Sequence, residues 1–302
     1  MFSKLVLKAN AKINLFLKVK GLDGRGFHVL ETLTASVGLC DFVEIAAASG
    51  VKVAMSVPID GKNNAEAAAQ DLVSKYGLKG ADIYIKKNIP IASGLGGSSA
   101  DTAAVIYGLK KIYGFENGDY SVYGDDVPFM LKGGIGGIYE ARCGGEPSKP
   151  KGGIGGVAEA YAEKLSESLR AYGILIVKPS GGMLTKDIFE IYDRIKDGLP
   201  DNPARLDALA GALIKGDKRA AADNMYNELY YAALKADPDI ETVRRDILRA
   251  GAFGAVMTGS GNAFVGLFGG RQGAEAAEAE LKGRYHDVIV CGYADRGIEE
   301  VL

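Results

Sequence analysis

The clearest pattern along the chain lies between residues 12 and 20, where hydrophobic and polar positions alternate. Ile13, Leu15, Leu17 and Val19 fall on one side, and lysine and asparagine residues make up most of the other. A period of two is typical of a strand with one buried face. Further strand-like segments follow at residues 28–37, 41–46 and 51–57.

The rest of the chain mixes helical and strand-like patterns. An asparagine-capped helix is predicted over residues 64–75, a strand over 81–87 and a second helix that ends near 113. Later helices are predicted at 157–172, 185–195, 204–214, 218–236, 240–250 and 274–281, and strands at 172–178, 253–258, 263–268 and 287–291. This order predicts an α+β protein of two lobes, residues 1–155 and 156–302, with a ligand site between them.

Composition narrows the class of protein. The chain has 302 residues, 47% of them hydrophobic, and a formal net charge of −2. These values are typical of a soluble globular protein and argue against binding of nucleic acid or an anionic membrane through bulk charge. No apolar run approaches the roughly 18 residues of a membrane span, and charges occur too early for a signal peptide. Cys40, Cys143 and Cys291 lack disulfide or zinc spacing, so we expect a cytoplasmic protein.

The segment Pro90–Asp101 (PIASGLGGSSAD) is rich in glycine and small hydroxyl residues and connects a predicted strand to a predicted helix. Glycines let the backbone approach an anion, and the free N–H groups of the first helical turn point toward it. The spacing is not that of a P-loop, because no lysine follows the last glycine, nor that of a dinucleotide-binding fold. We therefore predict a site for the phosphates of a nucleotide, with a plain glycine turn as the alternative.

Two early segments carry candidate chemistry, and each has a simple structural alternative. Lys12 and Asn14 lie on the polar side of the first strand, where a lysine is usually just solvated. The turn at residues 24–28 (GRGFH) holds His28, one of only two histidines. A lone histidine near a strand start is more often an ordinary core or surface residue than a catalytic group.

Two later segments are similar in kind. Asp125 and Asp126 precede an apolar turn, where a carboxylate could act as a general base or hold Mg²⁺, or where Asp125 could cap a short helix. Residues 258–262 (TGSGN) connect two apolar strands, and a glycine hairpin explains them fully.

The order of these segments is more specific than any one of them. An AKINL strand, a G-x-G-aromatic-His turn, the glycine-rich loop, a D-V-P-F turn and a late G-S-G hairpin resemble the GHMP small-molecule kinases. The resemblance covers most of the chain and is thin between residues 144 and 172. It implies a two-lobed fold, with an N-terminal lobe like ribosomal protein S5, a ferredoxin-like C-terminal lobe and the active site between them. It also implies phosphorylation of an alcohol by ATP, with Mg²⁺ assisting.

The resemblance implies roles for single residues as well. Asp126 would be the general base that takes the hydroxyl proton, and Lys12 would lie beside it and steady the alkoxide. The glycine hairpin at residues 259–261 would lie near the phosphates. The ATP phosphates would be held by Pro90, Ala92, Ser93, Gly94, Leu95, Gly96, Gly97, Ser98 and Ser99.

The implied substrate is a small molecule, a cytidine diphosphate sugar alcohol. Asn14, His28 and Thr185 would contact it, and Phe27 and Phe189 would stack on the cytosine. Phe27 stands where the family usually has tyrosine. The Mg²⁺ ligands, and the choice between monomer and homodimer, are left open.

Two other functions fit the same fold. One is a different GHMP kinase or an ATP-dependent decarboxylase of diphosphomevalonate, whose pocket should carry basic residues for a diphosphate. The other is a sensor that binds ATP or the sugar alcohol without phosphoryl transfer. The pair Phe27 and Phe189 disfavours the decarboxylase, and a sensor would need neither Lys12 nor Asp126.

Overall fold

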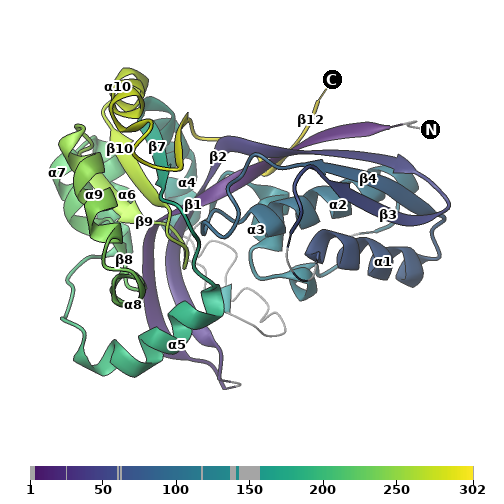
Figure 1. Ribbon diagram of the computed structural model, residues 1–302, viewed down its shortest axis with the longest axis horizontal. Helices are drawn as coiled ribbons and strands as arrows, with labels where there is room; N and C mark the ends of the chain where they lie inside the picture. The colour runs from purple at the N-terminus through teal and green to yellow at the C-terminus, as the bar shows by residue number, and fades with distance from the viewer. Residues whose placement is uncertain are drawn as a thin grey trace.

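A computed structural model describes residues 4–24, 26–59, 61, 63–116, 118–136, 141–142 and 157–301. Its strands form two sheets, with helices packed against both (Figure 1). The strands are β1 (Leu5–Leu22), β2 (His28–Ala47), β3 (Gly50–Met55), β4 (Gly80–Lys86), β5 (Ile135–Gly136), β6 (Ala141–Arg142), β7 (Gly173–Lys178), β8 (Tyr226–Asn227), β9 (Gly254–Met257), β10 (Phe264–Phe268), β11 (Asp287–Cys291) and β12 (Ile298–Glu300).

Ten α-helices are described in the same part of the chain. They are α1 (Asn64–Tyr76), α2 (Gly97–Tyr113), α3 (Val127–Lys132), α4 (Val157–Ala171), α5 (Thr185–Ile195), α6 (Leu206–Lys215), α7 (Lys218–Asn224), α8 (Tyr230–Ala236), α9 (Ile240–Arg249) and α10 (Arg271–Leu281). Short 3-10 turns occur at Ser121–Tyr123 and Lys196–Gly198. Among the described residues, no helix combines the length and apolar character that crossing a membrane requires.

The first sheet has the strand order β12-β1-β2-β4-β3. The long antiparallel pair β1–β2 is its centre. On one side of the sheet, α2 packs on β1 and β2, and α1 packs on β3 and β4 (Figure 1). The strand predicted at residues 12–20 belongs to β1, but both of its faces are buried from Lys12 to Leu17. The two predicted strands at 28–37 and 41–46 are one strand, β2. β8 and β12, from the second half of the chain, both add to β1.

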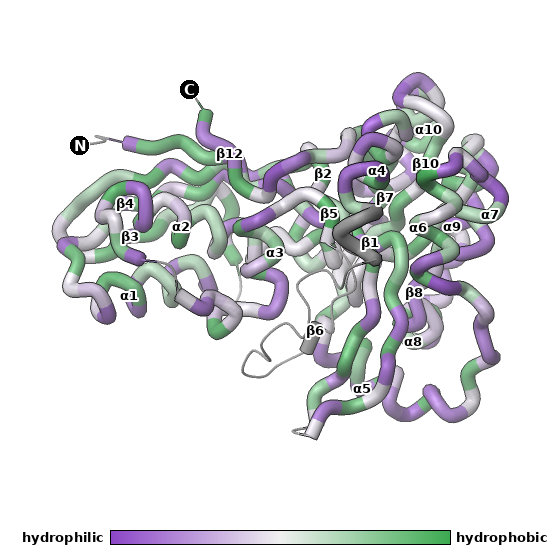
Figure 2. The backbone as a smooth tube through the Cα atoms, turned by 180° about the vertical axis from the view of Figure 1, so that it is seen from behind, coloured by the Kyte–Doolittle hydropathy of each residue, from purple (hydrophilic) through white to green (hydrophobic). Residues whose placement is uncertain are grey.

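The second sheet is antiparallel in the order β11-β7-β10-β9. α10 packs on β7, and α7 and α9 pack on β9. Purple and green alternate along the helices on the outside of the molecule in Figure 2, as expected for helices with one buried face. The predicted helix at 185–195 is confirmed as α5, and the predicted strand at 172–178 is confirmed as β7.

The single helix predicted over residues 218–236 is wrong, because the structure has α7, β8 and α8 there. Asn227 breaks the helix: its side chain donates to the carbonyls of Met257 and Gly259 and accepts from the backbone N–H of Leu229. These tertiary hydrogen bonds outweigh the local helix propensity. The predicted lobe boundary at residues 155/156 and Cys143 lie outside the described residues, and the division into two lobes stays a prediction.

Candidate active site

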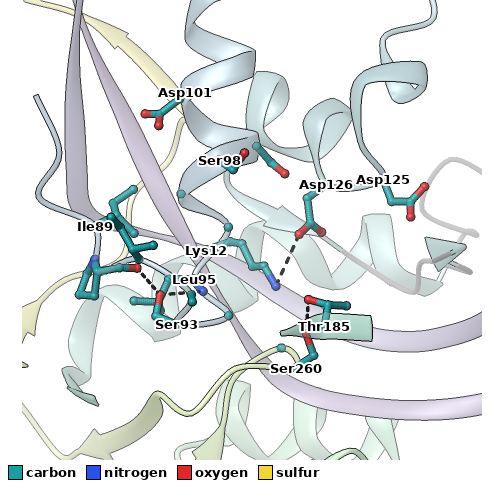
Figure 3. A pocket seen from close by; sticks show the side chains of 18 of the residues that line it. Lys12, Ile89, Ser93, Leu95, Ser98, Asp101, Asp125, Asp126, Thr185 and Ser260 are labelled. Atoms are coloured by element: carbon teal, nitrogen blue, oxygen red, sulfur yellow. Dashed lines mark hydrogen bonds and ion pairs between the residues drawn. The ribbon is translucent and has the colours of Figure 1, made fainter. Parts of the chain in front are cut away.

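A cavity of ≈ 390 Å³ lies where the glycine-rich loop, β1, the start of α3, the start of α5 and the β9–β10 turn meet (Figure 3). It brings together most of the residues predicted to form the site. Its lining includes every loop residue from Pro90 to Ser99, together with Lys12, Asn14, Asp125, Asp126, Thr185, Phe189, Gly259 and Ser260. Of the predicted site residues, Phe27 and His28 are outside this lining.

The glycine-rich loop packs backbone against backbone on the β9–β10 turn. A Cβ atom on Gly94, whose φ is +81°, would lie 2.2 Å from the carbonyl oxygen of Thr258. A Cβ atom on Gly261 would lie 2.2 Å from the carbonyl carbon of Ser93. Only glycine allows this approach, so the two glycine segments that lie far apart in the sequence form one surface.

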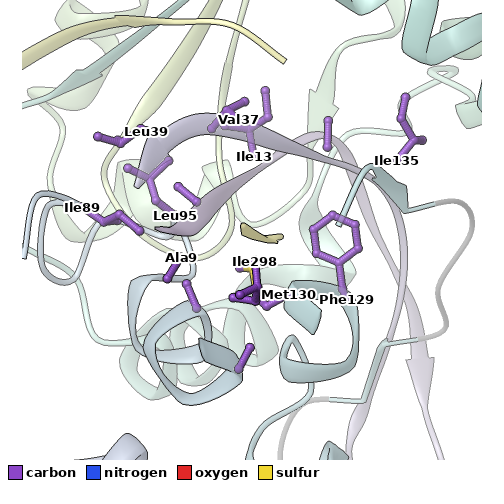
Figure 4. Close-up of a cluster of buried hydrophobic side chains, with 14 of the residues drawn as sticks. Ala9, Ile13, Val37, Leu39, Ile89, Leu95, Phe129, Met130, Ile135 and Ile298 are labelled. Carbon is purple, nitrogen blue, oxygen red and sulfur yellow. The ribbon is translucent and has the colours of Figure 1, made fainter. Parts of the chain in front are cut away.

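The apolar residues on either side of the loop anchor it in the core. Leu95 and Ile89 are both buried and lie among core residues that include Ala9 and Val37 (Figure 4). The backbone N–H of Lys12 donates to the carbonyl of Leu95 at 3.0 Å. The loop is therefore fixed to β1 and to the core, while its backbone lines the cavity.

The N-terminus of α2 opens into this cavity without a side-chain cap. Gly96 occupies the cap position with φ +74°, and a Cβ atom there would lie 2.3 Å from Cε of Met130. The first backbone donor within the helix is Ala100, whose N–H bonds to the carbonyl of Gly96. The N–H groups of Gly97, Ser98 and Ser99 therefore have no acceptor within the helix, an arrangement that favours a bound anion.

Lys12 and Asp126 face each other beside this helix end. Nζ of Lys12 lies 3.7 Å from Oδ2 of Asp126 and donates to Oδ1 of Asn14 at 2.7 Å. The lysine side chain is 7% exposed and the aspartate side chain 43%. Asp126, and not Asp125, is the cap residue of α3, and it makes no capping hydrogen bond with its side chain. Its carboxylate can therefore accept a proton from a ligand in the cavity.

Asn14 holds the lysine in place and joins the two sheets. Its side-chain amide donates to the hydroxyls of Thr32 and Thr34, which leaves its oxygen for Lys12. Its backbone N–H donates to the hydroxyl of Thr258 at 2.9 Å. Asn14 is thus a structural support of the site.

α5 and the start of β2 form a second part of the site. The ring of His28 packs against Phe189 with centroids 4.6 Å apart and ring planes tilted by 31°, and His28 Nε2 lies 3.0 Å from Oδ1 of Asp193. Slight burial raises the pKa of Asp193, but the hydrogen bond with His28 opposes it, and the pKa of Asp193 is lowered overall. Thr185 pairs with the hydroxyl of Ser260 at 2.8 Å. The ring beside Phe189 is thus that of His28, and the stacking of Phe27 and Phe189 on a cytosine stays a prediction.

Three buried charged residues beneath the loop were not predicted. Lys87, directly after β4, bonds to Asp41 of β2 and, at 2.6 Å, to Asp101 of α2. Burial raises the pKa of Asp101 to about 8, Lys87 opposes the rise and Asp41 adds to it. Although burial alone would lower it, the two carboxylates raise the pKa of Lys87. These positions are far apart in the sequence, and a lysine directly after an apolar strand is the one local signal.

Comparisons with known proteins agree with this geometry. The family model described as "GHMP kinases N terminal domain" matches residues 63–134, and the one described as "GHMP kinases C terminal" matches residues 209–287. A protein of Syntrophomonas wolfei named 4-diphosphocytidyl-2-C-methyl-D-erythritol kinase is 33% identical over 302 residues, 96% of this chain and 98% of its own length. A Caldicellulosiruptor saccharolyticus protein of the same name is also 33% identical, over 95% of this chain and 96% of its own.

Solved structures give the same grouping. A crystal structure of 4-(cytidine 5'-diphospho)-2C-methyl-D-erythritol kinase has a TM-score of 0.73 and 28% identity, covering 95% of this chain and 99% of its own. Homoserine kinase from Cytophaga hutchinsonii, at a TM-score of 0.68 and 18% identity, covers 100% of this chain and 98% of its own, and shares the fold alone. Both the N-terminal and the C-terminal domain models of the family match, and the relatives match over nearly their full length. The chain therefore belongs to the GHMP kinases and is an ATP-dependent kinase.

Proposed function

We propose that this protein transfers the γ-phosphoryl group of ATP to the 2-hydroxyl of 4-diphosphocytidyl-2-C-methyl-D-erythritol, a step of non-mevalonate isoprenoid precursor synthesis. The observation that carries the proposal is the similarity over nearly the whole chain to relatives and a solved structure that bear this kinase's name. The other solved kinases, at 18% identity or less, give no comparable support for their own substrates.

The N-terminus of α2 and the side chain of Lys12 are placed where they would position the phosphates and offset their charge. The ATP phosphates would accept hydrogen bonds from the free N–H groups at Gly97–Ser99 and lie against the loop from Pro90 to Gly96. Asp126 would accept the hydroxyl proton as the substrate oxygen attacks the γ-phosphorus, and the bond to the β–γ bridging oxygen would break to release ADP. Lys12 would offset the charge on the attacking oxygen.

Mg²⁺ is the cofactor that this chemistry needs, and the residues present fit it. No group of three metal-ligating side chains occurs in the described ranges. Mg²⁺ needs no such group, since one or two carboxylates, phosphate oxygens and waters are its usual ligands. Asp125 lines the cavity and would supply such a carboxylate. When bound, the ion would shield the phosphate charge during transfer.

The substrate would lie across Asn14 and Thr185, with its cytosine near Phe189, His28 and Phe27. The contact between the rings of Phe189 and His28 supports this placement, since aromatic surfaces suit a flat base. We place the enzyme in the cytoplasm, as monomer or homodimer.

The test is ADP release from purified protein, ATP, Mg²⁺ and the diphosphocytidyl substrate. We expect turnover that depends on ATP, Mg²⁺ and the diphosphocytidyl substrate and is at least about a hundredfold slower in Asp126→Asn. Mevalonate, homoserine and diphosphomevalonate serve as alternative substrates. Faster ADP release with one of these, or carbon dioxide release with the last, would contradict the proposal, and ATP binding with no turnover on any would point to a sensor.

A further inference from the structure

A buried ammonium group shared by two buried carboxylates lies directly beneath the phosphate loop. Asp41 is 0% exposed, Asp101 3%, and Lys87 lies between them. Lys87 and Asp101 both line the cavity, and a Cβ atom on Gly97 would lie 3.3 Å from Nζ of Lys87. This cluster therefore touches the first turn of α2, where the free N–H groups lie.

The two carboxylates have very different hydrogen-bond partners. Oδ1 of Asp41 accepts the backbone N–H groups of Asn88, at 2.6 Å, and Ile89, at 2.8 Å, and Oδ2 accepts from Lys87. Oδ2 of Asp101 also accepts from Lys87, but its Oδ1 is buried without a partner among the described residues. Donors around a carboxylate favour its charged form, and an unpartnered buried oxygen disfavours it. A single proton in this cluster therefore belongs on Asp101.

Two charged groups act on Asp101, and each lies in or next to a strand that packs against α2. These are Lys87, after β4, and Asp41, in β2. With both carboxylates ionised the cluster carries a net charge of −1, and with one proton it is neutral. A net negative charge at this position would repel the phosphates of a bound nucleotide.

We propose that Asp101 is a positioning residue held as a neutral carboxylic acid beside the Lys87–Asp41 ion pair, so that the floor of the phosphate loop carries no net negative charge. The proposal deepens the proposed function and rests on it only in taking ATP as the phosphate ligand. The state of Asp101 itself is independent of which alcohol is phosphorylated.

The first test compares thermal unfolding of Asp101→Asn and Asp41→Asn at pH 7, with Asp82→Asn on the exposed face of β4 as the matched control. An amide replaces a neutral acid without changing charge, so Asp101→Asn should unfold at or above the wild-type temperature. Asp41→Asn loses charged hydrogen bonds and should unfold about 5 °C or more lower. Equal losses in both variants would mean that Asp101 is ionised, and would overturn the proposal.

The pH dependence of stability is a second test, because a neutral Asp101 fixes the direction in which stability changes with pH. The folded protein keeps a proton on Asp101 that the unfolded chain releases near its ordinary pKa, so this group's contribution to stability falls as pH rises from about 4 to about 8. Asp101→Asn removes this pH-dependent contribution to stability. Its unfolding temperature relative to wild type should therefore rise between pH 5 and pH 8 and then level off. A difference that stays flat or falls would overturn the proposal.

The third measurement is ATP binding by calorimetry, which needs no turnover. Between pH 7 and pH 9 the wild-type Kd should rise roughly three- to tenfold relative to that of Asp101→Asn, the effect of one added charge nearby. If the sugar alcohol kinase activity fails while this ratio holds, the proposed function falls and the role of Asp101 stands. A ratio unchanged with pH would contradict the link to phosphate binding.

Discussion

Lys12 and Asp126 meet at one side of the cavity, and different parts of the fold hold them. The lysine is buried in β1 and oriented by Asn14, whereas the aspartate lies at the N-terminal cap position of α3, makes no capping hydrogen bond with its side chain and is partly exposed. This difference suits their proposed roles, since a base must reach the substrate and a fixed charge must stay in place. Removing either should affect the reaction more than the fold.

We expect Asp126→Asn to lower kcat about 10²- to 10⁴-fold, the usual contribution of a general base, with little change in the KM for ATP. Steady-state kinetics with the diphosphocytidyl substrate measure this, and Asp82→Asn is the exposed control. A decrease of less than tenfold would show that another group takes the proton.

Phe189 gives a second prediction at the residue scale. Its ring lies on the cavity wall and packs against His28. Phe189→Ala should raise the KM for the cytidine substrate by about 5- to 100-fold, since stacking on a base contributes roughly 1–3 kcal/mol, and should leave the KM for ATP unchanged. Phe115→Ala, which removes a ring stacked on Tyr76 outside the cavity lining, is the control. Equal changes in both KM values would argue against this placement.

Single residues were predictable where a short motif carried them. The loop was identified from local sequence, whereas Lys12 and Asp126 were singled out by the resemblance to the family, and all of them line one cavity. The Asp41–Lys87–Asp101 cluster was not, because its members come from three elements whose packing no local pattern encodes. The contact between His28 and Phe189 was not predicted either, because it joins the start of β2 to α5 and no local pattern encodes it.

At the scale of elements, the glycine-rich loop and the β9–β10 turn act as one unit. Gly94→Ala should lower the unfolding temperature by about 5–10 °C and weaken ATP binding at least about tenfold, since the new Cβ atom would meet the Thr258 carbonyl at a positive φ. Gly211→Ala, in α6 with open space around it, should be neutral or slightly stabilising. Calorimetry measures the unfolding temperature and the ATP affinity of both variants. A Gly94→Ala protein that binds ATP normally would contradict the packing argument.

The elements themselves were predicted well where the hydrophobic period was strong. α2, α5 and β7 have nearly the predicted bounds, and the strand over 12–20 extends further at both ends. The sequence pattern missed β8 and β12, which have two and three residues. Strands this short exist because β1 offers them a partner, and that partner is set by the tertiary fold.

For the molecule as a whole, the end of the described chain completes the first sheet. β12 pairs with β1, Ile298 is buried in the larger core, and Asn10 binds the Arg296 carbonyl. Ile298→Ala should lower the unfolding temperature by about 5–10 °C. Val301→Ala, three residues later and 41% exposed, should change it by less than about 2 °C. Thermal unfolding of both variants tests this, and equal effects would mean that β12 adds little.

For the molecule as a whole, the central proposal is that this kinase phosphorylates one hydroxyl of a cytidine diphosphate sugar alcohol. The most direct test is ³¹P NMR of the product formed from the diphosphocytidyl methylerythritol, ATP and Mg²⁺. We predict one new phosphomonoester signal, assigned to the 2-hydroxyl, that appears in step with ADP and is absent with Asp126→Asn. Inorganic phosphate as the only new signal besides those of ADP, or a phosphate ester at another hydroxyl, would contradict the proposal.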